Sequence, residues 1–575
     1  MKTKFYLVFN FLFILSLLLP AHFNGLYGFD WTDTTFDFQQ ALNILNNQDI
    51  GKDFFTHIPG FSYISEAFFL NFFGVSFENH RNLGLIFPII EYLCCYLIIF
   101  KILALNNQKN YHFWSIIFSS LIIVSYWGTQ LFWSNFRLAI TYSFLIFTLI
   151  FFSYHKVNKI LNITFVFLIT LILILQILTK QSHGINLILT FISLLSVLLL
   201  KRKSIYFILQ IISLFFIFLL FNILVLTYLT GLDFPITLSE TTGSLDLKGL
   251  SVKRPLEIIF TIIGISTFKS IFYSIFIILS VIIFLFLFQK SSLRFFILIP
   301  LSISSITAYY FPIIWVILHY VLVGFLIYQF FYFCKNILNI KKLNEKVLNS
   351  TALFASSFPL IGSFVAEQLS WPGPNYIQPN LYMFLLIIMT VTYFLNNNND
   401  FLINKKYFFI YLIIIFILSA FFIETKPRRY DHKNEGLVKI KNPATFRDWK
   451  VSKKTFEVIK KLIDISDNCG GNSLFQLSWM PISYEITSRK NITGYYLPYA
   501  DTIGLEEGIK IVKSLNNNPP DLLILQPKYY NYDGPFPAKG LKYIYKNLDL
   551  TLEKYDFREK LNDNHNNFMV YCKKN

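Results

Sequence analysis

Charged residues are scarce in this chain, and their scarcity excludes an ordinary soluble fold. Only 14% of its 575 residues are charged, whereas 54% are hydrophobic and 66 are Phe. Soluble globular domains carry roughly a quarter charged residues. The apolar residues also come in runs of about twenty, the helix length that crosses a hydrocarbon core of about 30 Å. We therefore expect an all-α, polytopic membrane bundle.

About thirteen of these runs are long enough to span a membrane. The first, 5–20, follows Lys2 and Lys4, and no small-x-small cleavage site comes after it. We therefore expect a retained span there rather than a signal peptide. The other runs lie near 83–105, 112–128, 138–154, 161–179, 184–200, 204–230, 270–288, 295–311, 313–333, 347–365, 380–395 and 407–423.

The excess of positive charge follows the expected topology. A net charge of +17 would by itself be compatible with nucleic-acid binding. Before residue 424, however, 17 of the 25 Lys and Arg fall in seven alternate short loops, all on one side of the thirteen spans. This is the positive-inside pattern. It predicts a cytoplasmic amino terminus in an inner or plasma membrane, with the lipid bilayer as partner and no nucleic acid.

The composition changes after residue 423. We call residues 424–575 the tail; they are ordinary in charge and numerous enough for one domain. Periodicity predicts helices at 452–466 and 503–515 and strands at 473–478, 521–526 and 568–572. We therefore divide the chain into a membrane domain, 1–423, and a soluble extracytoplasmic α/β domain, 424–575. Cys469 and Cys572 lie in the tail, and the sequence leaves open whether they pair.

Acidic residues gather in the first outer loop, residues 28–80. Seven of the 15 Asp and Glu before residue 424 lie there, and Glu91 is the one acidic residue expected inside a span. Segments 36–45 and 61–73 are predicted helices that lie along the membrane with apolar faces toward lipid. Carboxylates held beside them could act as a general base or bind a hard divalent cation. They could equally be solvated or cap helices, a role that suits Asp33.

Part of this loop resembles the first outer loop of GT-C membrane glycosyltransferases. The resemblance covers Asp33-Thr-Thr-Phe-Asp-Phe-Gln-Gln-Ala41, then Gly51-Lys-Asp-Phe-Phe-Thr-His-Ile-Pro-Gly-Phe-Ser-Tyr63, then Phe73-Gly74 and Arg81. This superfamily includes protein O-mannosyltransferases and the aminoarabinose transferases that modify lipid A. The resemblance implies a GT-C-like bundle and an inverting transfer of a sugar from a polyprenyl-phosphate donor. The acceptor hydroxyl would belong to a glycan, lipid or protein on the outer face.

The resemblance also implies roles for particular residues. It places the catalytic carboxylate at Asp33, eight residues before Ala41, with Asp30 as the rival. Thr34 stands where the family more often has a second acidic residue, so metal binding and a divalent-cation cofactor stay open. Asp53 and His57 are further candidates as ligands or acceptor-orienting groups, as is Arg81, and a structural His57 is an equal alternative.

A lipid phosphate that leaves during transfer needs cations or hydrogen-bond donors around it. Outer-side cations at span ends are few, which singles out Lys180, His183 and Arg137 as candidate ligands of the donor phosphate. Lys180 could instead snorkel to the interface. The alternative functions are a transporter or flippase, or a polymerase, of lipid-linked sugars. The sequence does not disclose the sugar, the acceptor, the carrier length or the oligomeric state.

Overall fold

The computed structural model describes most of the bundle, the first outer loop and the tail. Asp30 and His57 lie outside the described residues, as do the expected spans 270–288, 295–311 and 407–423. For Asp33 the backbone is described but the side chain is not. The described residues are 10, 12–20, 22, 33–56, 58–108, 111–126, 133–155, 159–201, 203–232, 312–370, 379–396, 436–478, 480–496, 505–526, 539–562 and 567–574.

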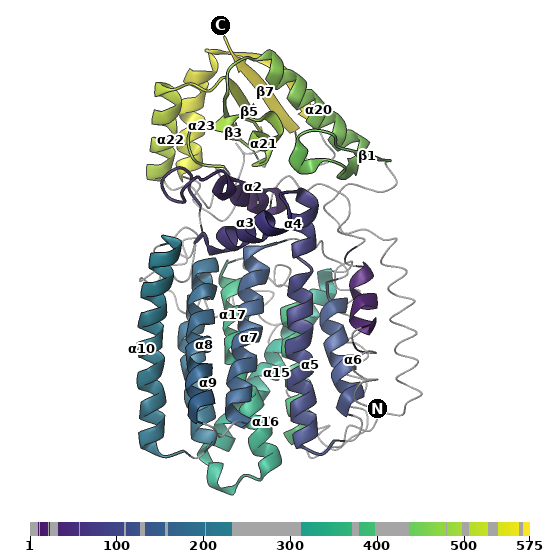
Figure 1. Ribbon diagram of the computed structural model, residues 1–575, viewed down its shortest axis with the longest axis vertical. Coiled ribbons are helices and arrows are strands. Elements are labelled where there is room, and N and C mark those ends of the chain that lie inside the picture. Colours follow the sequence, from purple (N-terminus) through teal and green to yellow (C-terminus); the bar gives the residue numbers. More distant parts are fainter. Residues whose placement is uncertain are drawn as a thin grey trace.

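The chain is an integral membrane protein whose parts are stacked along one axis. Figure 1 shows a helical bundle, then three short helices of the first outer loop, then the tail at the far end. Within the described ranges, seven helical segments are long and apolar enough to cross a membrane. The expected total of thirteen spans stays a prediction. The bundle helices are α5 (Ile86–Leu105), α6 (Tyr111–Val124), α7 (Asn135–His155), α8 (Lys159–Thr179), α9 (Ile185–Leu200), α10 (Ile205–Thr230), α15 (Pro312–Leu338), α16 (Glu345–Ser356), α17 (Phe358–Ser370) and α18 (Pro379–Asn396).

The expected span 347–365 lies within Glu345–Glu367, a segment long and apolar enough to cross a membrane, but its helix is interrupted. It is divided between α16 and α17 at Ser357, whose amide donates to the carbonyl of Phe354 in a tightened last turn, 3.0 Å. Pro359 follows as the second residue of α17 and has no N–H to continue the hydrogen-bond ladder. A proline in the first turn of a helix is well tolerated, so the chain restarts there.

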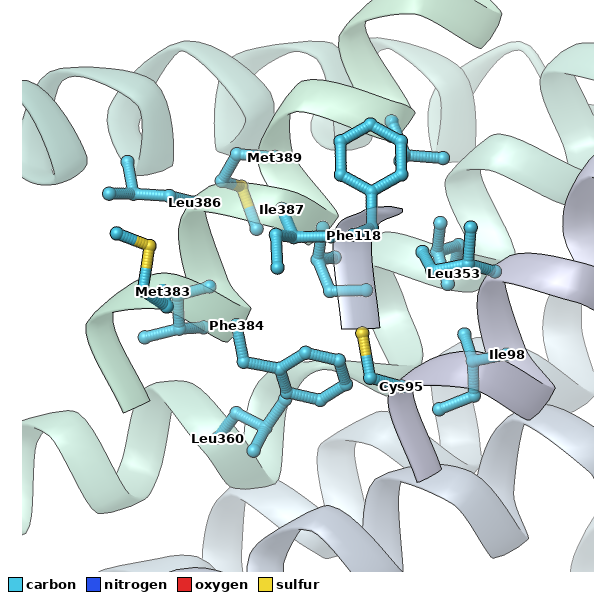
Figure 2. Close-up of a cluster of buried hydrophobic side chains, with 14 of the residues drawn as sticks. Cys95, Ile98, Phe118, Leu353, Leu360, Met383, Phe384, Leu386, Ile387 and Met389 are labelled. Carbon is cyan, nitrogen blue, oxygen red and sulfur yellow. The ribbon is translucent and has the colours of Figure 1, made fainter. Parts of the chain in front are cut away.

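Aromatic and aliphatic side chains fill the interior of the bundle. Figure 2 shows Cys95, Phe118, Leu353 and Phe384 converging from four different helices, and all four are fully buried. Phe384 also stacks on Phe144 of α7, with ring centroids 4.3 Å apart. Because lipid tails are as apolar as these side chains, such close packing rather than water exclusion holds the helices together.

The first outer loop forms α2 (Asp33–Leu45), α3 (Phe61–Phe73) and α4 (Phe77–Leu83). Both predicted helices of this loop are therefore confirmed. On α3, Phe68 and Phe72 are 67% and 77% exposed, as expected for a face turned toward lipid. For α2 the expected lipid-facing surface is wrong. Phe36, Phe38, Ala41 and Leu42 are buried, and Phe38 packs against Phe446 of the tail with ring centroids 5.8 Å apart.

The tail is an α/β domain, as predicted. Its five-stranded sheet has the order β4-β3-β5-β7-β6; β4, β3 and β5 are parallel, and β7 runs antiparallel to β5 and β6. All five predicted tail elements are confirmed, as α20, α22, β3, β5 and β7. The elements are β1 (Leu437–Lys439), β2 (Lys450–Ser452), α20 (Lys453–Asn468), β3 (Ser473–Leu477), α21 (Ser483–Thr487), β4 (Lys490–Asn491), α22 (Leu505–Asn517), β5 (Leu522–Leu525), α23 (Lys539–Leu552), β6 (Tyr555–Asn562) and β7 (Asn567–Lys573). The boundary at residue 424 stays a prediction, because 401–435 lie outside the described residues.

One disulfide and one carboxylate fasten the end of the tail sheet that is remote from the bundle. Cys469 and Cys572 form a disulfide between the end of α20 and β7, which settles the open question of their pairing. Asp521, before β5, accepts hydrogen bonds from the amides of Asn472 and Ser473 at 2.9 and 3.0 Å. Gly471 lies so close to this carboxylate, with φ at +66°, that a side chain would collide with it.

The opposite end of the sheet meets the first outer loop. Leu522 pairs with Cys572 next to the carboxyl terminus, so the carboxyl ends of β3 and β5 point away from that terminus and toward the bundle. At this end the amide of Phe55 donates to the carbonyl of Gly494, 2.9 Å, and the Phe55 ring stacks on Tyr495 at 4.8 Å. The tail is thus joined to the first outer loop by both backbone and side chains.

Candidate active site at the tail-facing end of the bundle

Three ionisable side chains meet at the end of the bundle that faces the tail. They are Lys180, just after α8, His183, just before α9, and Glu367, near the end of α17. Lys180 follows the last residue of α8, and its Nζ lies 2.9 Å from Oε1 of Glu367. His183, in the 3₁₀ turn Gln181–Gly184, places Nε2 3.1 Å from the same oxygen. Each of these side chains is at most 5% exposed. The structure brings Lys180 and His183 onto Glu367, a carboxylate that the sequence analysis missed, and their role as donor-phosphate ligands stays a prediction.

Neighbouring amides and hydroxyls orient the imidazole of His183. Its Nδ1 lies 3.2 Å from Nε2 of Gln176 and 3.0 Å from Oγ of Ser363. Because an ionised carboxylate can only accept, Nε2 carries the proton directed at Glu367. Asn186 donates to Ser363 and to Oε1 of Gln176, each at 3.1 Å. Buried and multiply bonded groups of this kind hold a single rotamer.

A second buried carboxylate lies nearby in the same part of the bundle. Glu91 accepts hydrogen bonds from Tyr126 and Thr141, both at 2.8 Å, and from Asn380 at 2.7 Å. The guanidinium of Arg137 lies over the Tyr126 ring at 5.7 Å and adds positive charge beside Glu91. Arg137 is thus placed beside Glu91 rather than on Glu367.

The first turn of α7 lies between the two clusters. Nζ of Lys180 is 3.3 Å from the centroid of the Phe136 ring, and Arg137 is the next residue along the chain. Asn135, one residue earlier, donates to Oδ1 of Asp37 on α2 at 3.3 Å. Three successive residues of α7 therefore make these contacts. Asn135 contacts the first outer loop, Phe136 contacts Lys180, and Arg137 contacts Tyr126 beside Glu91.

A further buried pair lies within the first outer loop. Glu66 of α3 is hydrogen-bonded to Nδ1 of His80 on α4, and neither side chain is exposed. Burial raises the pKa of Glu66 well above its usual range, which favours a neutral carboxyl in this apolar setting. Arg81, the next residue, lies over the rings of Phe77 and Trp449, at 5.6 and 5.8 Å. The predicted candidate Arg81 thus lies against the tail.

The remaining predicted site residues divide between this region and the exposed loop. Asp33 is the first residue of α2, on the helix that Asn135 contacts through Asp37. Asp53 is exposed, and its Oδ2 accepts a hydrogen bond from the amide of Asp49 at 2.9 Å, which closes a turn. Asp30 and His57 lie outside the described residues. Among the described residues, no group of three or more His, Cys, Asp or Glu is arranged to hold a metal ion.

Comparison with known proteins finds one kind of likeness. No protein-family model matches the sequence, and no curated protein sequence matches it. Among solved structures the chain is similar to the crystal structure of ArnT from Cupriavidus metallidurans bound to undecaprenyl phosphate. The match covers 99% of this chain and 98% of that chain, with a TM-score of 0.40 and 9% sequence identity.

Proposed function

We propose that the chain is an inverting membrane glycosyltransferase. It moves a sugar from a polyprenyl-phosphate donor to an acceptor hydroxyl of a glycan, lipid or protein outside the cytoplasm. The observation that carries this proposal is the layer of buried cations and carboxylates around Lys180, Glu367 and Glu91, next to an acidic first-loop helix. Ionisable groups buried in a membrane bundle are costly and usually functional.

The donor phosphate is assigned to Lys180, His183 and Arg137. The leaving lipid phosphate gains negative charge during transfer, and preorganised cations and donors in a dry site stabilise that charge. Without donor, Glu367 holds Lys180 and His183 in place of an anionic ligand. A phosphate that enters the site would then compete with one carboxylate oxygen for both groups.

The general base is assigned to Asp33, with Asp30 as the rival. An acceptor hydroxyl must lose its proton as it attacks the anomeric carbon, and a positioned carboxylate can take that proton. Asp33 begins α2, whose next turn carries Asp37 onto Asn135 at the tail-facing end of the bundle. The first turn of α2 therefore lies near the proposed phosphate ligands. Asp53, His57 and Arg81 are kept as candidates for orienting the acceptor.

The tail and the tail-facing end of the bundle are assigned to the extracytoplasmic side. Basic residues in and next to the loops α9–α10 and α15–α16 support this, since these loops lie at the end of the bundle away from the tail: Lys201, Lys203, Lys335, Lys341, Lys342 and Lys346. The Cys469–Cys572 disulfide supports it as well, because disulfides persist in oxidising compartments outside the cytoplasm.

Transport of lipid-linked sugars, or their polymerisation, is the second candidate. The expectation that Glu91 is the one acidic residue within a span is wrong, because Glu367 is also buried near the end of α17. Two buried carboxylates could couple a proton to transport. Both lie toward the tail-facing end of their helices, however, whereas transporter sites lie near the bilayer midplane. This placement favours the transferase.

The test uses the full chain in lipid nanodiscs with undecaprenyl-phosphate-linked, radiolabelled sugars and soluble or lipid acceptors. We expect the wild-type protein to transfer label and Asp33→Asn to lose about 10²- to 10⁴-fold in rate. Asn keeps the size of Asp and most of its hydrogen bonding, so folding should survive. Asp49→Asn, an exposed carboxylate of the same loop, is the matched control.

Three other outcomes would change the assignment of the base or of the function. Near-normal transfer by Asp33→Asn together with a collapse in Asp30→Asn would move the base three residues upstream. Normal transfer by both variants would reject the first outer loop as its source. Movement of labelled lipid across proteoliposome membranes with no transferred product would select the transporter.

A further inference from the structure

One side of α2 carries amide groups that are buried without hydrogen-bond partners. Gln39, Gln40 and Asn43 are 4%, 0% and 2% exposed. Nε2 of Gln39 donates to Oδ1 of Asn43 at 3.0 Å, within the helix itself. Four other polar atoms have no partner among the residues that the structure describes: Oε1 of Gln39, Oε1 and Nε2 of Gln40, and Nδ2 of Asn43. We call these three side chains the amide strip.

Burying these amide atoms without hydrogen bonds lowers stability unless a ligand or water bonds to them. Nearly all buried polar groups in folded proteins are hydrogen-bonded, and each exception calls for an explanation such as a bound ligand or water. Exchanging the amide oxygen and nitrogen of Gln40 does not remove the problem, since neither end has a partner. The free atoms include donors and acceptors on adjacent positions of one helix.

Helical register places the amide strip on the side of α2 that faces the bundle. Gln40 follows Phe36 by four residues and Asp37 by three, so the three share one side. Phe36 contacts Tyr63 of α3 and Asp37 contacts Asn135 of α7. Phe38, on the other side, contacts Phe446 of the tail. The amide strip therefore lies toward the proposed phosphate ligands rather than toward the tail.

We propose that the amide strip binds hydroxyl groups of the transferred sugar. A primary amide has two donor hydrogens and an accepting oxygen, which complement hydroxyls that both donate and accept. A lipid phosphate only accepts and would leave the amide oxygens unpaired, and a prenyl chain would leave all four atoms unpaired. A neutral polyol is the ligand class that satisfies the whole strip. The proposal rests on the proposed function, because it assigns the sugar subsite of the same donor.

The spacing along α2 agrees with this assignment. Asp33 begins the helix and lies seven residues before Gln40 on the same side, an axial distance of about 10 Å. One sugar ring with a hydrogen bond at each end can bridge such a distance. The proposed base would then act at the anomeric end of the ring while the amide strip holds its far hydroxyls.

The test separates sugar recognition from lipid recognition. Binding to the full chain in nanodiscs is measured for undecaprenyl phosphate alone and for undecaprenyl phosphate linked to glucose, mannose or 4-amino-4-deoxyarabinose. We expect wild-type protein to bind at least one sugar-linked lipid about 10- to 100-fold more tightly than the bare lipid, as two or three hydrogen bonds allow. Gln40→Met should abolish that preference and leave affinity for the bare lipid unchanged. Gln39→Met is the second variant, and Gln329→Met, a buried glutamine in α15, is the matched control.

Each result is decisive. A preference that survives in Gln40→Met and Gln39→Met overturns the proposal. Binding of the bare lipid without any sugar preference in the wild type overturns the sugar subsite but leaves the donor-phosphate proposal standing. Failure of the wild type to bind undecaprenyl phosphate at all overturns the proposed function, and the sugar subsite with it.

Discussion

Replacing Glu367 by Gln removes the carboxylate that holds Lys180 and His183 together, and its effect can be worked out from the structure. At a separation of 2.9 Å the Lys180–Glu367 attraction is about 6 kcal/mol for an effective dielectric constant of 20. Much of this attraction offsets the cost of burying two charges. The stability lost in Glu367→Gln is therefore mainly the cost of a buried lysine without a counterion. A lysine that sheds its proton at pH 7 costs roughly 4 to 5 kcal/mol, which caps the penalty. We expect Glu367→Gln to destabilise the protein by about 3–5 kcal/mol.

The structure predicts different losses of stability for replacing Lys180 and for replacing Glu367. In Lys180→Met, Glu367 keeps its hydrogen bond from His183, whose ring Ser363 and Gln176 hold in place. In Glu367→Gln, the Phe136 ring is the partner that remains for the ammonium in this structure. Lys180→Met should therefore cost less than Glu367→Gln. The double variant Lys180→Met/Glu367→Gln should recover most of the stability, because no buried charge is left alone.

The assay is a double-mutant cycle on thermal unfolding in detergent, repeated for sugar transfer from undecaprenyl-phosphate donors. We expect coupling of about 2–3 kcal/mol in stability. Transfer should stay low in the double variant, since the proposed phosphate ligand is gone. Coupling below about 0.5 kcal/mol would refute the buried ion pair. Full transfer by a stable double variant would refute Lys180 as a phosphate ligand.

Two further predictions concern the tail. The variant Cys469→Ser/Cys572→Ser removes a disulfide that closes a separation of 103 residues, and it should lower the free energy of unfolding of the tail by roughly 2–5 kcal/mol; unchanged urea unfolding of the tail would contradict this. Burial raises the pKa of Asp521, but hydrogen bonds from Ser473 and from the amides of Ser473 and Asn472 outweigh it, with help from Arg489, so the folded pKa is lowered. The stability that Asp521 adds should be complete above about pH 4, its unfolded value, and be lost as the pH falls through the folded value. The stability gap between wild type and Asp521→Asn, measured by circular dichroism, should therefore narrow in acid, and a constant gap would contradict the assignment.

Much of the fold could be predicted because local patterns of apolar residues indicate both membrane-spanning and amphipathic helices. The run 184–200 predicts α9 (Ile185–Leu200) almost to the residue, since lipid requires about twenty apolar residues whatever the neighbours are. In the tail, Ser452 caps α20 by accepting from the amide of Thr455 at 3.2 Å, and the apolar face that follows has helical spacing. The lipid-facing role of α2 could not be judged in this way, because its burial depends on Phe446, about 400 residues later in the chain.

The candidate site was predicted in part. Lys180 and His183 stood out as polar residues between two apolar runs, and that local contrast needs no tertiary information. Glu367 lies two residues past the end of the expected span 347–365, so its sequence position resembled that of a solvated loop residue. Its burial follows from packing of α17 against α9 and α7, which no local pattern encodes. The four unpaired atoms of the amide strip were likewise invisible, because Gln and Asn are ordinary residues in an amphipathic helix.

The burial of α2 from two sides bears on how the proposed base is positioned. A helix of 13 residues is marginal by itself, so its place must come from packing on its neighbours. On one side Asp37 accepts from Asn135 of the bundle, and on the other Phe38 packs against Phe446 of the tail. The first-loop segment after α2 is also tied to the tail, through the backbone hydrogen bond from Phe55 to Gly494. Removing either neighbour would leave α2 without one of these contacts. The position of Asp33 therefore depends on the tail as well as on the bundle, although the tail contributes no residue to the proposed phosphate site.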